Sequence, residues 1–455
     1  MTSAARALPL RIPGRIPMWW GLSAFIWLLP LHILVVAFLF GALGWPAPLV
    51  RVIAAWKETL IALLAALAVL RFVTGAGPAI AVRWLDLVMA GLFGLAVGYL
   101  IAANVWFDQG LPLLAQLYGF RDAAFVLLLY FVGRATPEAA TSPRHIRALF
   151  LVGTITSVIA IFERLLVTPE LLLVLGVARY VQDFIGVSVS ASNNLYGLPD
   201  NYWTGLGDHL VLRAGSTYLS AQAFAIPFLV IMPAATLYVT APERTRMRLA
   251  WLGYTAIWIG LLLTITRMTI IACLVQTVVI IGMRRRWTTL VWSSVIAVLA
   301  SFVALLAVPG LANFAWDTLT WQTGSSLSHA RDWREGLQNL WLHPLGVGLG
   351  ATDIISWRFG VTPLAGENQF LRFAVELGIV GLLLHLASLV GAITTGLASW
   401  RQRDKGPALR DTGLLVAVTA FGVAINAWTT SVFNAMLLTY VFFWLLGSVS
   451  SASET

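Results

Sequence analysis

Ionisable side chains gather in one stretch of an otherwise strongly apolar chain, between Ser325 and Gly381. Its first part reads SSLSHARDWREGLQNLWLHPLGVGLG, and after a short connection it continues as GENQFLRFAVELGIVG. Charged groups in or beside a membrane are costly to keep, so a cluster of them marks a candidate functional site. We therefore expect the chemistry of this protein to take place in this stretch.

Glu367 is the sharpest candidate within it. A carboxylate can act as a general base, especially where partial burial raises its pKa. Alternatively, Glu367 caps the helix that begins at Asn368 or Gln369, where a negative charge complements the helix dipole. Asn368 is expected to position a substrate or to cap the same helix.

Basic residues occur in the first part of the stretch. Arg331 and Arg334 are three residues apart, which places them on one face of a helix, and His329 lies just before them. They contact a substrate or, alternatively, form the solvated basic face of a helix on the membrane surface.

The composition defines the class of protein. Hydrophobic residues make up 59% of the 455 residues and charged residues only 11%, whereas soluble proteins are about half apolar and about a quarter charged. This predicts an all-α polytopic membrane protein that forms a single integral membrane domain over residues 1–455. The single cysteine, Cys273, excludes an intrachain disulfide and a multi-thiolate metal site.

Apolar runs of about 20 residues predict about twelve membrane-spanning helices. The predicted spans are Trp19–Ala42, Glu58–Val73, Val82–Ala102, Asp122–Val132, Arg147–Val167, Tyr218–Val239, Leu249–Thr264, Met268–Met283, Thr288–Val308, Gln369–Ala398, Thr412–Ala427 and Met436–Val449.

The net charge of +9 comes mainly from arginines in short clusters between the apolar runs. Such clusters orient a membrane protein with its positive loops inside, so we expect no nucleic-acid partner. The bias predicts cytoplasmic termini, with two long segments on the outside of the membrane, at residues 170–217 and 309–366. The second holds a predicted amphipathic helix with Trp333 and Trp341 at helical spacing, followed by the stop signal HPLGVGLG.

Four segments of the second half resemble the O-antigen ligase and polymerase superfamily, the WaaL and Wzy type membrane glycosyltransferases. They read RAGSTYLSAQAFA, LTITRMTIIA, SLSHARDWREGLQNLWLHPLGVGLG and ENQFLRFAVELGIVGLL. The resemblance implies a GT-C-like fold and transfer of a glycan from an undecaprenyl diphosphate carrier to an acceptor sugar hydroxyl, at the periplasmic face of the bacterial inner membrane. The expected partners are this lipid-linked oligosaccharide, the glycan acceptor, membrane lipids and a chain-length regulator protein. The resemblance also implies an enzyme that works without a metal, and we expect no cofactor.

A diphosphate leaving group needs cationic groups that hold it as its charge develops, and arginine suits this because its planar fork stays charged. The resemblance places Arg267 in this role, with a snorkelling interfacial arginine as the alternative. Arg213 holds phosphate in the same way or has a structural role in its loop. Arg331 is implied as a further catalytic residue, while His329 and Arg334 are implied as substrate contacts. For Arg121, an ion pair with Asp122 competes with diphosphate contact.

The resemblance leaves the type of transfer open. Glu-Asn at positions 367–368, where ligase-like members have His-Asn, and His329 favour a polymerase, with a ligase as the alternative. A lipid-linked glycan flippase is the competing class, but a transporter is expected to show internal repeats and polar groups near the bilayer midplane. We find no repeat, and the polar groups concentrate on one side.

Overall fold

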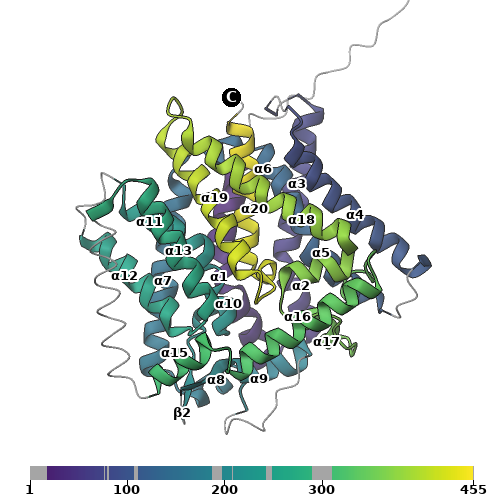
Figure 1. Cartoon of the computed structure of the whole chain (residues 1–455), viewed down its shortest axis with the longest axis vertical. Helices are drawn as coiled ribbons and strands as arrows, with labels where there is room; N and C mark the ends of the chain where they lie inside the picture. The colour runs from purple at the N-terminus through teal and green to yellow at the C-terminus, as the bar shows by residue number, and fades with distance from the viewer. Residues whose placement is uncertain are drawn as a thin grey trace, which may run out of the picture.

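Helices account for nearly all of the regular structure in the computed structural model (Figure 1). It describes residues 18–75, 77–78, 81–106, 111–186, 197–206, 209–241, 248–288 and 310–453. The α-helices of the first half are α1 (Trp19–Ala37), α2 (Ala47–Ala54), α3 (Trp56–Val73), α4 (Trp84–Trp106), α5 (Leu113–Ala123), α6 (Leu128–Arg134), α7 (Arg144–Leu166), α8 (Pro169–Val174), α9 (Val177–Arg179) and α10 (Ala221–Ala225). Those of the second half are α11 (Phe228–Val239), α12 (Arg248–Leu263), α13 (Arg267–Met283), α15 (Leu311–Leu319), α16 (Gly324–Leu342), α17 (Asp353–Arg358), α18 (Gln369–Arg401), α19 (Pro407–Asn426) and α20 (Met436–Ala452).

The described residues bear out an all-α polytopic membrane protein. They contain 8 helical stretches that are long and apolar enough to cross a membrane, and α12, α13 and α20 are shorter apolar helices. Every predicted span within the described residues coincides with one of these helices, whereas most of Thr288–Val308 lies outside them. The predicted span Asp122–Val132 is too short, because α5 and α6 together form an apolar stretch from Leu113 to Arg134.

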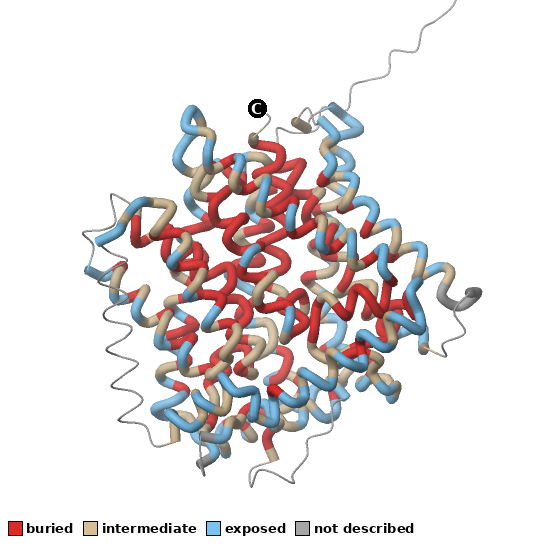
Figure 2. Tube along the Cα trace, viewed as in Figure 1, coloured by how far each residue is buried: buried red, intermediate tan, exposed pale blue. Residues whose placement is uncertain are grey.

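Buried residues fill the middle of the molecule, and exposed ones lie around it (Figure 2). Helix α20 is buried along its length, with Trp444 fully enclosed. It approaches α6 so closely that a Cβ on Gly447 would lie 2.0 Å from the carbonyl oxygen of Tyr130. In contrast, the peripheral α3 and α4 expose apolar side chains such as Val69 (61%) and Leu87 (65%). This outward apolar surface suits contact with lipid.

The start of α19 and the end of α20 lie at the same end of the molecule (Figure 1), and arginines contact residues there. Arg134 pairs with Asp86 at 3.0 Å, and Arg284 pairs with Asp411 at 2.6 Å. Arg83 donates to the hydroxyl of Ser453 near the C-terminus. All three arginines belong to loops that the charge bias assigns to one side of the membrane.

The opposite end carries short elements that the apolar runs did not predict (Figure 1). Helices α8, α9, α15, α16 and α17 lie there, together with an antiparallel hairpin of β1 (Trp203–Leu206) and β2 (His209–Leu212). The predicted amphipathic helix is α16. It ends at Leu342, as the glycine-rich stop signal predicts.

The glycine-rich segment after α16 packs into a break in α18. Gly378 interrupts that helix with φ 70°, and the amide of Ile379 donates to the carbonyl of Pro344 at 2.9 Å. A Cβ on Gly346, which has φ +85°, would lie 2.5 Å from the nitrogen of Gly378. Both positions therefore require glycine, and the contact fixes α16 against the start of α18.

Candidate active site

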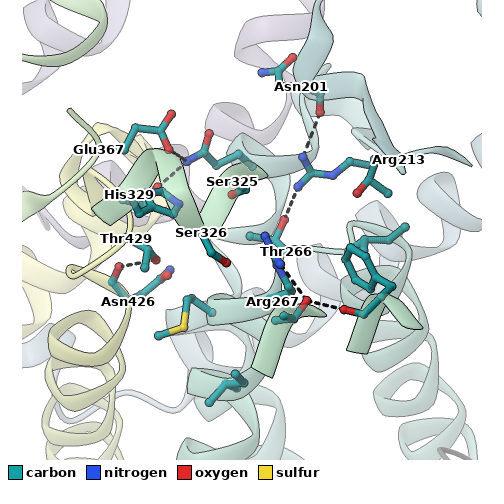
Figure 3. Close-up of a pocket in the computed structure, with 18 of the residues that line it drawn as sticks. Asn201, Arg213, Thr266, Arg267, Ser325, Ser326, His329, Glu367, Asn426 and Thr429 are labelled. Atoms are coloured by element: carbon teal, nitrogen blue, oxygen red, sulfur yellow. Dashed lines mark hydrogen bonds between the residues drawn. The ribbon is translucent and has the colours of Figure 1, made fainter. Parts of the chain in front are cut away.

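A pocket of about 500 Å³ lies among the β1–β2 hairpin, α15 and α16, at the end of the molecule opposite the C-terminus (Figure 1), and Figure 3 shows it from close by. Its lining comes from segments that are far apart in the sequence, at residues 201–204, 213, 222, 265–271, 314–329, 367 and 426–430. Glu367 and His329 lie on one side of it, and Arg213 and Arg267 lie on the other. The structure thus brings together four of the predicted site residues.

Glu367 lies in the turn just before α18 and is half-buried. Its Oε2 atom accepts a hydrogen bond of 3.0 Å from the side-chain amide of Gln222, which also donates to the hydroxyl of Thr430. No basic side chain among the described residues lies within ion-pair distance of it. Burial raises the pKa of Glu367 to about 7, and the negative charge of Asp353 adds to this. A carboxylate with this pKa is suited to accept a proton near neutral pH.

Arg213 follows β2 and is held by three acceptors on neighbouring segments. Its guanidinium donates to the carbonyl of Thr264 at 2.7 Å, to the carbonyl of Asn201 at 3.1 Å and to the hydroxyl of Thr266 at 2.8 Å. Burial lowers the pKa of Arg213 to about 10, and the nearby charge of Arg267 contributes. The group remains charged at neutral pH, and none of its three acceptors is an anion.

Arg267 is the first residue of α13 and reaches across to α15 and α16. It donates to the hydroxyls of Thr318 at 2.8 Å and Thr323 at 3.2 Å, and its guanidinium lies 5.3 Å from the ring centroid of Phe314. Neither Arg267 nor Arg213 forms an ion pair within the part of the chain that the structure describes. Two oriented guanidinium groups without carboxylate partners form a site suited to a ligand with several anionic oxygens.

The backbone beside these arginines is strained. Ile265, between α12 and α13, has φ 51°, which is unfavourable for a β-branched residue. It lines the pocket, and the same turn supplies Thr264 and Thr266 to Arg213. Strain of this kind persists where the surrounding structure holds a functional geometry.

Helix α16 presents His329 to the pocket and its arginines to the outside. The Nδ1 atom of His329 is buried without a hydrogen-bond partner among the described residues. Burial lowers the pKa of His329, and the charge of Arg267 lowers it further. Arg331 and Arg334 are exposed and do not line the pocket.

Two other predicted site residues have structural partners. Asn368 is the N-cap of α18, since its Oδ1 accepts from the amide of Leu371 at 2.9 Å, and its Nδ2 donates to the carbonyl of Trp428 at 3.0 Å. Arg121 pairs with Asp122 at 2.7 Å, which agrees with the ion-pair alternative. Neither residue lines the pocket.

Sequence reasoning did not single out the residues that orient these charges. Gln222 positions Glu367, and Thr318 and Thr323 position Arg267. Gln222 lies in the segment RAGSTYLSAQAFA, where a polar side chain at the start of an apolar helix could have been noticed. No local pattern marks the two threonines, because their role depends on how α15 and α16 pack against α13.

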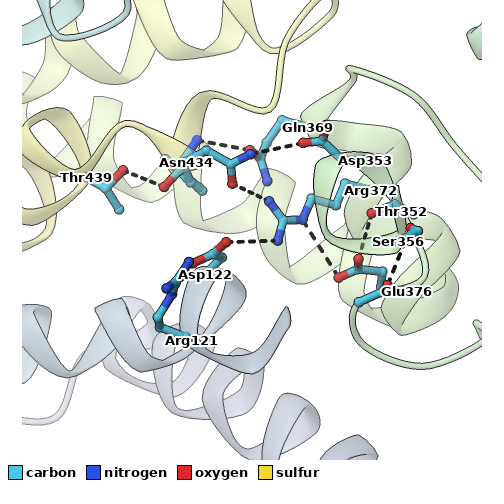
Figure 4. A network of polar contacts seen from close by, with 12 residues as sticks. Arg121, Asp122, Thr352, Asp353, Ser356, Gln369, Arg372, Glu376, Asn434 and Thr439 are labelled. Carbon is cyan, nitrogen blue, oxygen red and sulfur yellow. Dashed lines mark hydrogen bonds and ion pairs between the residues drawn. The ribbon is translucent and has the colours of Figure 1, made fainter. Parts of the chain in front are cut away.

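A second polar cluster surrounds Arg372 on α18 (Figure 4). Arg372 is 2% exposed and donates to Asn434 at 2.6 Å, with Asp122 at 3.9 Å and Glu376 at 3.8 Å. Asn434 in turn donates to Asp353 at 2.9 Å. In this cluster the buried cation has two carboxylates, unlike the arginines of the pocket.

These observations define a helical membrane protein with a cationic pocket, and Glu367 is the one carboxylate among the described residues that line it. Residues 252–386 match the family model described as O-antigen ligase. This confirms the resemblance to the O-antigen ligase and polymerase superfamily and supports a glycosyltransferase-like enzyme that transfers glycans. The matched residues include Arg267, His329 and Glu367 but not Arg213. The match does not distinguish polymerases from ligases, and no curated protein matches the chain.

Proposed function

We propose that this protein is a polysaccharide polymerase that transfers a glycan from a polyprenyl diphosphate carrier to a sugar hydroxyl of an acceptor chain. The observation that carries the proposal is the pocket itself. It places Arg213 and Arg267, which lack carboxylate partners among the described residues, opposite Glu367, whose carboxylate lacks a cation partner there.

The transfer assigns a role to each of these groups. Arg213 and Arg267 hold the diphosphate and stabilise the negative charge that develops on it as the bond from the anomeric carbon to the phosphate oxygen breaks. Glu367 accepts the proton of the acceptor hydroxyl, whose oxygen forms the new bond to the anomeric carbon. Gln222 orients the carboxylate, and His329 is placed to hydrogen-bond to sugar hydroxyls. The lipid diphosphate leaves with both electrons of the broken bond.

We place this pocket on the periplasmic side of the inner membrane. The arginine-rich loops gather at the other end, together with the C-terminus, and positive loops favour the cytoplasmic side. In this orientation both termini are cytoplasmic, and residues 170–217 and 309–366 belong to the periplasmic part that builds the site. A chain-length regulator would contact the protein on this side.

The carboxylate at position 367 favours polymerisation over ligation, because the resemblance implies histidine there in ligase-like members. A ligase, which moves a finished glycan to lipid A-core or another acceptor, is the second candidate. It uses the same diphosphate site and differs in the acceptor.

The test uses purified protein in lipid with short polyprenyl-diphosphate-linked repeat units, followed by glycan sizing on a gel. A ladder of longer lipid-linked chains is the expected result. A donor that never lengthens but is consumed when lipid A-core is added would identify a ligase. The absence of covalent change under both conditions would contradict glycan transfer and favour a transporter.

A further inference from the structure

A second group of arginines lies outside the pocket, on aromatic rings. Arg121 of α5 and Arg358 of α17 share one ring, with guanidinium carbons 4.8 Å and 4.5 Å from the centroid of Tyr118. The segment before α17 packs tightly on α5, since a Cβ on Gly350 would lie 2.3 Å from the carbonyl oxygen of Ala115. This contact holds two like charges beside one ring.

Two more arginines approach from the first half of the chain. Arg51 of α2 lies 5.7 Å from the ring centroid of Phe184, whose carbonyl accepts a 3.2 Å hydrogen bond from Arg358. Arg179 of α9 lies 5.2 Å from the ring centroid of Phe40, and the rings of Phe40 and Phe184 are 5.1 Å apart. We call Arg51, Arg121, Arg179 and Arg358, with these three rings, the arginine–aromatic patch.

Carboxylates offset only part of this charge. Arg121 has Asp122 at 2.7 Å and Glu58 at 4.0 Å. Arg179 lies 3.9 Å from Asp183, and both of those side chains are about half exposed. Arg51 and Arg358 have no carboxylate partner in the described ranges. Burial lowers the pKa of Arg358, and the charges of Arg51 and Arg121 lower it further. Aromatic faces attract cations but do not neutralise them, so an anion would relieve the repulsion.

The surroundings of the patch indicate an anion carried by a lipid. Arg51 is exposed and stands beside Val52, which is 73% exposed, while Leu43 and Leu49 nearby are 53% and 48% exposed. Arginines above an exposed apolar surface suit a phosphate headgroup whose chains lie along that surface. A free phosphate would use the arginines but not the apolar side chains.

The patch is also joined to the start of α18. Asp122, the partner of Arg121, lies 3.9 Å from Arg372, and α18 begins two residues after Glu367. The start of α18 therefore connects the two regions. Glu367 of the pocket directly precedes it, and Arg372 in its first turns is linked through Asp122 to Arg121 of the patch. A polymerase must bind two lipid-linked glycans at once, and a single pair of arginines serves only the donor.

We propose that the arginine–aromatic patch binds the phosphate groups of a second anionic lipid, and that in glycan transfer this lipid is the polyprenyl diphosphate of the acceptor chain. The identity of the lipid as acceptor rests on the proposed function, whereas the anion site itself does not.

Native mass spectrometry of the purified full-length protein with sugar-free polyprenyl diphosphate tests the site. We expect two bound lipids in the unmodified protein, one in the Arg51→Gln/Arg358→Gln variant and one in the Arg213→Gln/Arg267→Gln variant. The control is Arg164→Gln, which changes an exposed arginine at the end of α7 and should still bind two.

Arg51→Gln alone removes an exposed side chain and should weaken the second binding step about tenfold, equivalent to one charge-assisted contact. Two lipids on a correctly folded Arg51→Gln/Arg358→Gln variant would overturn the proposal.

Further probes separate the sources of the anion. Phosphatidylglycerol that occupies the patch as well as polyprenyl diphosphate does would support an anionic-lipid site but overturn the acceptor role. Inorganic diphosphate that binds there as tightly as the lipid would overturn the lipid requirement.

Glycan transfer separates failure of this inference from failure of the proposed function. We expect the Arg51→Gln/Arg358→Gln variant to raise the KM for the acceptor about tenfold or more, with little change in the KM for the donor. Unchanged kinetics in this variant would overturn the acceptor role while the proposed function stands. A protein that binds two lipids but transfers no glycan would contradict the proposed function and leave the anion site supported.

Discussion

The pocket and the Arg372 cluster use the same residue types in opposite ways. In the cluster, the buried guanidinium of Arg372 has Asp122, Glu376 and the amide of Asn434 around it (Figure 4). In the pocket, Arg213 and Arg267 have only neutral acceptors in the described structure (Figure 3). The difference indicates that a charge balanced by the protein holds the fold, whereas a charge left for a ligand serves binding.

The physical cost of each arrangement agrees with this interpretation. Removing one partner of a buried ion pair leaves an uncompensated charge and costs about 3–5 kcal/mol of folding free energy. A pocket arginine that is oriented by hydroxyls and carbonyls contributes far less to folding. Substitutions in the two regions should therefore separate loss of activity from loss of stability.

The largest effect is expected for Glu367→Gln, which keeps the hydrogen-bonding shape but removes the base. We expect the rate of glycan transfer to fall by about 10³–10⁴-fold, at the upper end of the range for general-base removal, with unchanged thermal unfolding. The matched control is Glu335→Gln, which changes an exposed carboxylate on α16 and should transfer normally. A well-folded Glu367→Gln protein that makes normal polymer would remove Glu367 from the mechanism.

The next largest effect is a loss of stability rather than of chemistry. Arg372→Ala leaves Asp122 and Glu376 without their cation, so the free energy of unfolding should fall by about 3–5 kcal/mol. Thermal unfolding in detergent measures this change. If Arg372→Ala left stability unchanged and only stopped transfer, the distinction between the two regions would be wrong.

Arg267→Ala should reduce transfer by about 10²–10³-fold, the loss typical of removing one group that stabilises developing charge. Folding should be retained, because Arg267 bonds only to Thr318 and Thr323 in the described structure. Initial rates with a fixed lipid-linked donor measure the effect, and Arg164→Ala provides the control. Equal losses in both variants would indicate a general effect of surface charge.

The pH dependence of transfer tests the state of Glu367. The base must be deprotonated, and its pKa is about 7. We therefore expect the rate to fall about tenfold for each pH unit below that value and to level off above it. The residual activity of Glu367→Gln should lack this limb, and a limb retained in the variant would assign the titration to another group.

The smallest effect is expected for Asn368→Ala. Loss of the cap on α18 should lower the free energy of unfolding by about 1 kcal/mol, with transfer reduced only slightly. Asn368→Asp, which can still accept from the amide of Leu371, should recover most of the stability. A loss of transfer above tenfold at unchanged stability would instead favour a substrate-positioning role for Asn368.

The sequence could predict much of the helical architecture because length and apolarity alone identify a span. The predicted span Asp122–Val132 omitted α5, because Gln116 and Arg121 interrupt the apolar pattern of that helix. Short elements at the pocket end, such as the β1–β2 hairpin, carry no comparable signal. Their structure depends on packing against the helices rather than on the local sequence.

The site could be predicted in part. Motifs of the resembled family identified Arg213, Arg267 and Glu367. Each lies at the end of a helix or strand, and Arg267 and Glu367 stand beside the motif residues Thr266 and Asn368. The orientation of α16 was not available from the sequence. Once His329 faces the pocket, the helical period turns Arg331 and Arg334 away from it, which agrees with their exposure.

The most direct test of the central claim is a cryo-electron microscopy map of the full-length protein in lipid with a non-cleavable analogue of the lipid-linked donor. We predict density for the diphosphate between the guanidinium groups of Arg213 and Arg267, with the first sugar toward Glu367. Diphosphate density at another site, with the pocket empty at saturating analogue, would contradict the assignment of this pocket to glycan transfer.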